Sequence, residues 1–96
     1  IILCAIDGNG IFTLSEGKGL ELLNLQPGEV DGHSIFELYG AFPELIKDVR
    51  RALKGENFVS AVTLGEVIFE TRFLPTFDEV GNVVQVIGVC FDVTGQ

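Results

Sequence analysis

The sequence has few of the residues that most catalytic and metal sites need. Its 96 residues contain one histidine and two cysteines. No catalytic motif surrounds His33, so a Ser-His-Asp triad is excluded. Cys4 and Cys90 stand far apart and form no CxxC pair, which is too few ligands for a zinc site or for a secreted disulfide framework. We therefore predict neither an enzyme nor a metal centre.

Long apolar runs and an excess of basic charge are also missing. No run approaches the roughly 18 apolar residues of a membrane-spanning helix. The chain opens at Ile1 without the basic region of a signal peptide. The formal net charge of −8 repels phosphate backbones. We expect a cytoplasmic segment that contacts neither membrane nor nucleic acid, in a compartment that keeps its cysteines reduced.

The composition is that of one folded domain. Hydrophobic residues make up 47% of the sequence and charged residues 21%, which is too apolar for a disordered chain. This length leaves room for a single core. Because both ends of the chain fall in segments that look structured, we expect residues 1–96 to be one domain excised from a larger multidomain protein.

The first part of the chain alternates between turns and short apolar segments. Residues 1–7 and 11–14 are apolar and are separated by Gly8-Asn9-Gly10, which predicts a β-hairpin. Ser15 is then placed to cap a short helix, which Gln26-Pro27-Gly28 ends. We expect the buried side of this helix to carry Leu20, Leu22 and Leu23.

Two further helices are predicted in the middle of the chain. Ser34 can cap a helix of one to two turns, and Pro43 suits the first position of a longer helix that Gly55 ends. The longer helix carries a basic cluster of Lys47, Arg50, Arg51 and Lys54. We interpret these residues as cations that the helix dipole favours near its end, the alternative being a docking strip. The apolar face of this helix carries Leu45, Ile46, Val49 and Leu53, and its polar face carries Lys47, Asp48, Arg51 and Lys54.

After Gly55 the apolar pattern changes to a period of two, which is typical of strands. We predict strands at 57–64, 67–77 and 83–93. The short turns between them make sequential strands antiparallel. Together with the first hairpin, this order predicts an α+β fold in which one antiparallel sheet carries its helices on one face.

The last predicted strand is apolar on both of its faces, unlike a strand with one solvated face. One face carries Val84, Val86, Gly88 and Cys90, and the other carries Val83, Ile87, Val89, Phe91 and Val93. A contiguous apolar stripe indicates a contact site. We therefore expect a flanking helix or a second copy of the domain to cover an outer face formed by Ile87, Val89, Phe91 and Val93.

Several segments match, in order, the motifs of a known family. Asp7-Gly8-Asn9-Gly10-Ile11-Phe12 is similar to the opening hairpin of PAS domains, and Gly32-His33-Ser34-Ile35-Phe36-Glu37-Leu38-Tyr39 to the segment that carries a short helix in them. Pro75, Asp78, Gly81 and Ile87-Gly88-Val89 resemble their last hairpin, and Asp92-Val93-Thr94 resembles their terminal motif. Over its whole length, the chain resembles a PAS domain of bacterial signalling proteins such as sensor histidine kinases or diguanylate cyclases.

The resemblance implies a five-stranded antiparallel sheet in spatial order 2-1-5-4-3, with short helices on one face that enclose a small pocket. It implies a sensory module that forms a homodimer through the outer sheet face and flanking helices. It also implies an effector domain downstream in the same chain, a histidine kinase or a cyclic-di-GMP enzyme. Asp92, Val93 and Thr94 would pass the signal to that domain.

The same resemblance implies that the inner sheet face and the helices line the pocket. Thr71 is the one strong polar group expected there, so a ligand would be a small apolar molecule. The expected lining residues are Cys4, Ile6, Leu22, Phe36, Tyr39, Ile46, Val49, Phe69, Thr71, Phe73, Val86, Gly88 and Cys90.

The cofactors of the family do not suit this sequence. Flavin-binding light sensors of the family carry a cysteine where this chain has Ile35, and strand amides that the expected pocket positions lack. Haem-binding members take an axial histidine from the long helix, but residues 43–54 contain none and His33 lies in a turn. We expect neither flavin nor haem.

In the implied strand order, Cys4 and Cys90 face the pocket from neighbouring strands. A redox-sensing thiol pair is one interpretation. No group near them in the sequence would lower a thiol pKa, so we expect two small core residues.

Two alternatives to a dimerising regulatory module remain. One is a sensor that holds a small apolar ligand in the pocket. The other is a profilin-like structural domain without a sensing role, which shares the pattern of one sheet with helices.

Overall fold

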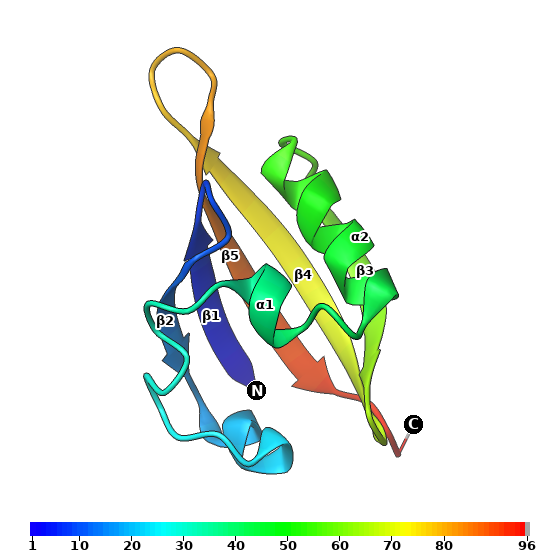
Figure 1. The fold of residues 1–96 in the computed structure, drawn as a ribbon. Helices are drawn as coiled ribbons and strands as arrows, with labels where there is room; N and C mark the ends of the chain where they lie inside the picture. The colour runs from blue at the N-terminus through cyan, green and yellow to red at the C-terminus, as the bar shows by residue number, and fades with distance from the viewer. Residues whose placement is uncertain (96) are drawn as a thin grey trace.

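A computed structural model describes residues 1–95, and five antiparallel strands form its single sheet. The order across the sheet is β2-β1-β5-β4-β3 (Figure 1), which confirms the expected α+β fold and strand order. The strands are β1 (Ile2–Asp7), β2 (Phe12–Glu16), β3 (Phe58–Leu64), β4 (Val67–Phe77) and β5 (Val83–Asp92).

Three short helices connect β2 to β3. They are the 3-10 helix η1 (Lys18–Leu23) and the α-helices α1 (Ile35–Leu38) and α2 (Pro43–Leu53). The helices α1 and α2 lie across one face of the sheet (Figure 1). None of the helices within residues 1–95 has both the length and the apolar character needed to cross a membrane.

The core between the helices and the sheet forms two clusters. In the larger one, Val49 of α2 packs with Phe73 and Val86 of the sheet. In the smaller one, Leu20 of η1 packs against Ile2 and Phe69. Since both clusters lie between the sheet and the helices, the buried face of the sheet is the one that the helices cover, and we call it the inner face.

Local sequence explains where the two α-helices begin and end. The hydroxyl of Ser34 accepts a hydrogen bond of 3.2 Å from the N–H of Phe36, which confirms the predicted cap. Pro43 is the first residue of α2. Gly55 follows its end with a φ of 100°, a conformation that glycine adopts without steric cost.

Ser15 does not cap a helix, so that prediction is wrong. It lies in β2 opposite Cys4 of β1 and is buried. The next helix begins only after Gly17. The ladder with β1 continues as far as Glu16, and its hydrogen bonds outweigh the local preference of serine for a helix start.

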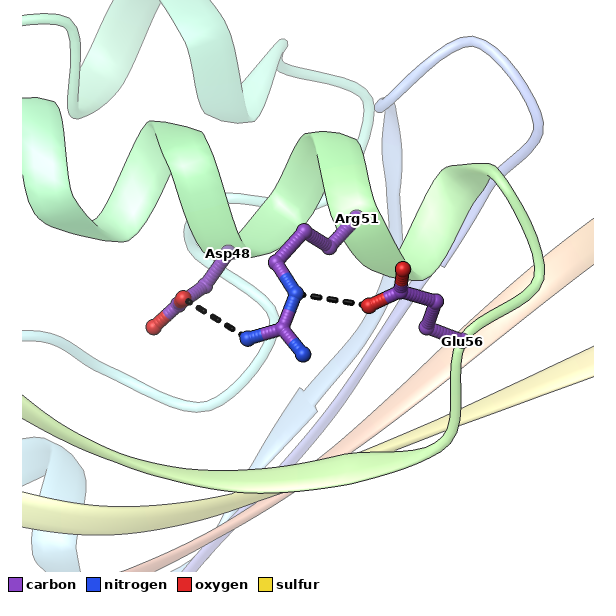
Figure 2. Close-up of polar contacts among 3 residues, drawn as sticks. All are labelled: Asp48, Arg51 and Glu56. Carbon is purple, nitrogen blue, oxygen red and sulfur yellow. Dashed lines mark hydrogen bonds and ion pairs between the residues drawn. The ribbon is translucent and has the colours of Figure 1, made fainter.

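Asp48 of α2 is also misplaced by the helical pattern, which assigns it to the polar face. It is only 8% exposed, and its Oδ1 lies 4.0 Å from Nη1 of Arg51. Figure 2 shows Arg51 between Asp48 and Glu56, with Nε of Arg51 2.6 Å from Oε2 of Glu56. The guanidinium also lies 3.8 Å from the ring centre of Phe58. Arg51 thus connects the end of α2 to the start of β3, and this connection accommodates the carboxylate of Asp48 beside the sheet.

A β-bulge at the start of β5 reverses the faces of its first two residues. Thr76 pairs with Gln85 but Phe77 pairs with Val83, so Val84 is an extra residue in β5. Val83 therefore packs against the core, while Val84 is 47% exposed. Strict alternation predicts the reverse for this pair, and it is wrong because it assumes an unbroken register.

Candidate functional site

An apolar cavity of about 80 Å³ lies between the inner face of the sheet and the segments that cover it. The sheet side includes Phe69 and Phe73 of β4, and the cover includes Ile35 of α1 and Leu45 of α2. An engineered cavity of about 150 Å³ can hold benzene, so this cavity suits a molecule of a few heavy atoms.

The structure brings part of the predicted pocket lining together at this cavity. Most of these residues belong to strands whose inner face the alternation and the strand order predict. The predicted residues that line the cavity are Cys4, Tyr39, Phe69, Thr71, Phe73, Gly88 and Cys90.

Leu22 does not reach the cavity and is 50% exposed. It belongs to η1, a 3-10 helix, in which side chains three residues apart share a face. Leu20 and Leu23 therefore face the cavity, and Leu22 faces away.

The remaining predicted lining residues lie elsewhere. Ile6, Val49 and Val86 are buried in the larger core cluster but do not line the cavity. Phe36 and Ile46 line a separate surface groove beside α2, with the basic residues of that helix. The periodicity of the sequence predicts which side chains are buried. It does not predict which of them surround a gap.

Sequence reasoning missed the cavity wall formed by the covering segments and by parts of β1, β2 and β3. A signal was present in Leu25 and Val30, since apolar residues on both sides of a Pro-Gly turn need a partner surface. The residues missed as lining are Ile2, Phe12, Ser15, Leu20, Leu23, Leu25, Val30, Ile35, Leu45, Val62 and Leu64.

Two thiols and a hydroxyl gather on the sheet wall of the cavity. Thr71 of β4 pairs with Cys90 of β5, and Cys4 of β1 pairs with Gly88 of β5. A Cβ atom at Gly88 would lie 2.8 Å from Sγ of Cys4. The missing side chain at Gly88 therefore leaves the space that the Cys4 thiol occupies.

The two thiols differ in acidity. A hydrogen bond from the Cys4 thiol, and a further one from Thr71, lower the pKa of Cys90 to about 7 against the opposing effect of burial. The same thiol–thiol hydrogen bond, together with burial, raises the pKa of Cys4 well above its usual range. The expectation that nothing nearby lowers a thiol pKa is therefore wrong, because strand pairing brings distant Cys4 and Thr71 beside Cys90.

The end of β5 is tied to the start of β4 by the predicted terminal motif. Oδ1 of Asp92 accepts hydrogen bonds from the hydroxyl and the N–H of Thr94, at 2.6 and 2.9 Å. The Thr94 hydroxyl accepts one of 2.9 Å from the N–H of Ile68. The N–H of Val93 donates to the carbonyl of Ile68, also at 2.9 Å. The motif thus closes the β4–β5 pair at the point where the chain leaves the sheet.

The outer face of the sheet is apolar on β1 and β5, whereas Arg72 and Glu70 of β4 lie opposite Val89 and Phe91. Leu3 of β1 pairs with Val89 of β5, and the two helices α1 and α2 lie on the opposite face (Figure 1). Phe91 is 48% exposed and Leu3 38% exposed, whereas Ile87, Val89 and Val93 are partly buried. These side chains form one stripe with solvent on its outer side.

Metal ligands do not cluster in the part of the chain that the structure describes: residues 1–95 contain no group of three or more that could hold an ion. His33 lies exposed in the turn before α1. The cavity and the outer face are therefore the two features on which a function can be argued.

A family model described as the PAS fold matches residues 1–96. The chain belongs to the PAS family. No curated protein matches this PAS domain in sequence. Membership confirms the resemblance carried by the Asp7–Phe12 hairpin and by the motif at Asp92–Thr94.

Solved structures show the same fold. This PAS domain is similar to a sensory box sensor histidine kinase from Vibrio cholerae, with a TM-score of 0.70 and 20% identity over 99% of this chain and 82% of that one. It is similar to the Vibrio cholerae Aer2 receptor, a dual PAS-heme oxygen sensor, with a TM-score of 0.69 and 18% identity over 96% and 93%. It is also similar to a light-oxygen-voltage domain studied with a flavin analogue. The TM-score is 0.70 and the identity 19%, over 96% of this chain and 76% of that one.

Proposed function

We propose that this PAS domain is the regulatory module of a larger signal-transduction protein and forms a homodimer through the outer face of its sheet. The observation that carries the proposal is the exposed apolar stripe that includes Leu3, Val89 and Phe91. Fully burying a side chain of this size contributes roughly 1.5–3 kcal/mol. A second copy of the domain, with flanking helices from the parent protein, would cover the stripe.

The path of β5 supports a role in signal transmission. Its residues alternate between the cavity wall, with Gly88 and Cys90, and the outer stripe, with Val89 and Phe91. The strand then runs directly into Asp92-Val93-Thr94. A change at either surface therefore reaches the segment from which a downstream domain would continue.

The output domain that we propose is a histidine kinase or a cyclic-di-GMP enzyme in the same chain, with the parent protein acting in the cytoplasm of a bacterium. Sensor histidine kinases among the similar structures support the first choice. The PAS domain itself would contribute regulation and no catalysis, as is general for this family. Family membership also favours this role over that of a profilin-like structural domain.

A second candidate function is the sensing of a small apolar molecule in the cavity. The apolar walls and the limited volume of about 80 Å³ favour it. Thr71 and Tyr39 supply polar groups at the wall. Such a ligand would be held mainly by contact with apolar side chains, with one or two hydrogen bonds to orient it.

We also propose that neither flavin nor haem occupies this domain. The volume of the cavity suits far smaller molecules. His33 is exposed and lies in a turn, and Ile35 stands buried at the position where the family's light sensors carry cysteine. An absorption spectrum of the purified protein with a flavin or Soret band would contradict this proposal.

Light scattering on this chain, and on a longer version that carries the adjoining segments of its parent, tests the proposed dimer. Val89→Glu places a charge in the apolar stripe and is expected to convert a dimer to a monomer. Val80→Glu is the matched control, because Val80 is 81% exposed in the β4–β5 loop, away from the stripe. Monomers in both unsubstituted versions would contradict dimerisation through this face, as would a dimer unaffected by Val89→Glu.

A further inference from the structure

Three neighbouring strands bring two thiols and a hydroxyl together on the cavity wall. Cys4 of β1 stands opposite Gly88, and Cys90 stands two residues further along the same strand, opposite Thr71. Cys4 and Cys90 are thus diagonal neighbours on one face of an antiparallel pair, and their thiols interact directly. Gly88 leaves room for the Cys4 thiol above β5, since a Cβ there would lie 2.8 Å from its Sγ.

The surroundings give the two thiols different reactivity. Hydrogen bonds from Cys4 and Thr71 stabilise the thiolate of Cys90, while Cys4 retains its proton. The thiolate is the nucleophilic form of cysteine, and a neighbouring thiol can react with it once it is oxidised. Both cysteines are free and partly exposed, so a small reagent has access to them.

We propose that Cys4 and Cys90 form a redox-responsive dithiol, which a small hydroperoxide converts to a disulfide within one chain. The use of this reaction as a signal rests on the regulatory function proposed above, whereas the reaction itself does not. A cavity of about 80 Å³ beside the thiols is large enough to admit hydrogen peroxide or a short alkyl hydroperoxide.

The reaction has two steps. In the first, the Cys90 thiolate attacks one peroxide oxygen: an S–O bond forms, the O–O bond breaks, and the leaving oxygen takes a proton from water and departs as water or an alcohol. Cys90 is then a sulfenic acid, oxidised by two electrons, and the peroxide is reduced. In the second, the Cys4 sulfur attacks that of Cys90: an S–S bond forms, the S–O bond breaks, and the hydroxide released leaves as water with the Cys4 proton.

Closing the disulfide would move the strands. Diagonal cross-strand Cα atoms are about 7–8 Å apart, whereas disulfides join Cα atoms roughly 4.4–6.8 Å apart. Oxidation therefore draws the Cα atoms of Cys4 and Cys90 together and shifts β1 locally relative to β5. Cys90 lies two residues before Asp92, so the displacement arises next to the terminal motif.

The test is to treat the protein with hydrogen peroxide and to measure its intact mass and its free thiols. The wild-type chain is expected to lose two hydrogens and both free thiols, and to recover them with dithiothreitol. Cys4→Ser is expected to stop at a sulfenic acid that dimedone traps at Cys90. Cys90→Ser, which leaves only the Cys4 thiol, is expected to react about tenfold more slowly than wild type. Cys90 has the larger thiolate fraction, and this outweighs the lower intrinsic nucleophilicity of an acidic thiol.

Thr71→Val provides a variant that keeps both thiols, and it is expected to slow the oxidation several-fold. Thr76→Val is its matched control on the same strand, where Thr76 pairs with Gln85 away from the thiols. Circular dichroism establishes that each variant is folded. Thiols that stay free in folded wild-type protein overturn the proposal, as do disulfides formed only between chains and an unchanged rate in Cys90→Ser.

Light scattering on the reduced and the oxidised protein separates this proposal from the proposed function. Monomers in both states, with a disulfide formed, contradict the dimer and support the dithiol. A dimer whose thiols do not react contradicts the dithiol and supports the proposed function.

Discussion

The hydroxyl of Thr94 accepts a hydrogen bond from the backbone N–H of Ile68 at a donor–acceptor distance of 2.9 Å, across 26 positions of the sequence. The same hydroxyl donates to Asp92 at 2.6 Å. One threonine thus joins the end of β5 to the start of β4, where the domain would hand its signal onward. The role of Asp92, Val93 and Thr94 in signalling is a prediction, but their geometry permits direct tests.

Thr94→Val keeps the shape of the side chain and removes both hydrogen bonds of its hydroxyl. We expect the amides of Ile68 and Val93 to exchange hydrogen several-fold faster, because the end of the β4–β5 pair opens more often. Exchange followed by NMR measures this. Thr63→Val, an exposed threonine of β3, is the control. Equal exchange rates in Thr94→Val and wild type would show that the hydroxyl does not hold the strand end.

Gly88→Ala tests whether the missing side chain at this position accommodates the Cys4 thiol. The new Cβ would lie 2.8 Å from Sγ of Cys4, so we expect a loss of about 1 kcal/mol in the free energy of unfolding. This loss is at the low end of the destabilisation expected for an overpacked core, because the Cys4 thiol can rotate away from the new methyl group. Adding Cys4→Ala is expected to recover most of the loss in urea unfolding. Gly95→Ala, with nothing within 4 Å, should be neutral.

Filling the cavity is expected to stabilise the domain. Val62 lines the cavity, and Val62→Ile places one more methylene in it, for a gain of about 0.5–1 kcal/mol. Val49 is fully buried in the core, so Val49→Ile has no space and is expected to cost about 1–3 kcal/mol. Urea unfolding compares the two. A loss of stability in both would show that the cavity is too small or too rigid to be filled.

Acid is expected to weaken the domain partly through two exposed carboxylates. Hydrogen bonds from the backbone of Asn82 and Val80 lower the pKa of Asp78, and hydrogen bonds from Thr94 lower that of Asp92. Because each native pKa lies below the unfolded value of about 4, the stabilisation is present above that pH. It is lost as the pH falls through the native pKa.

Unfolding in urea between about pH 6 and pH 3 measures this dependence. Asp78→Asn keeps an acceptor oxygen in the loop and is expected to flatten the acid limb of the stability profile. Glu79→Gln, which changes the adjacent exposed carboxylate, is the control. An identical acid limb in Asp78→Asn and wild type would contradict the assignment.

Much of the fold follows from local patterns. The turn after Asp7 forms because its Oδ1 accepts hydrogen bonds from the N–H groups of Asn9 and Ile11, at 2.8 and 3.0 Å. The predicted cap at Ser34 and the helix end at Gly55 depend on a few adjacent residues. The predicted strands at 57–64, 67–77 and 83–93 fall within one residue of β3, β4 and β5 at each end. Such features are local in the chain, so their patterns are sufficient to predict them.

The composition of the cavity wall was only partly predictable. Phe69, Thr71 and Cys90 belong to regular strands, and their alternation places them on the inner face. Leu22 was misplaced because the residues themselves do not distinguish a 3-10 helix from an α-helix. Ile6 and Val49 were assigned to the correct face, but a cavity exists only where side chains from several elements fail to fill the space between them.

Local patterns in the sequence are sufficient to predict the class of fold, the positions of its turns, and a last strand that is apolar on both faces. The pairing of distant segments keeps Ser15 in a strand, turns Val84 outward at the bulge, and brings Cys4 and Thr71 beside Cys90. Turns and periodicities depend on neighbours in the chain. Register, local gaps and thiol acidity depend on groups that are distant in the sequence and meet only when the sheet forms.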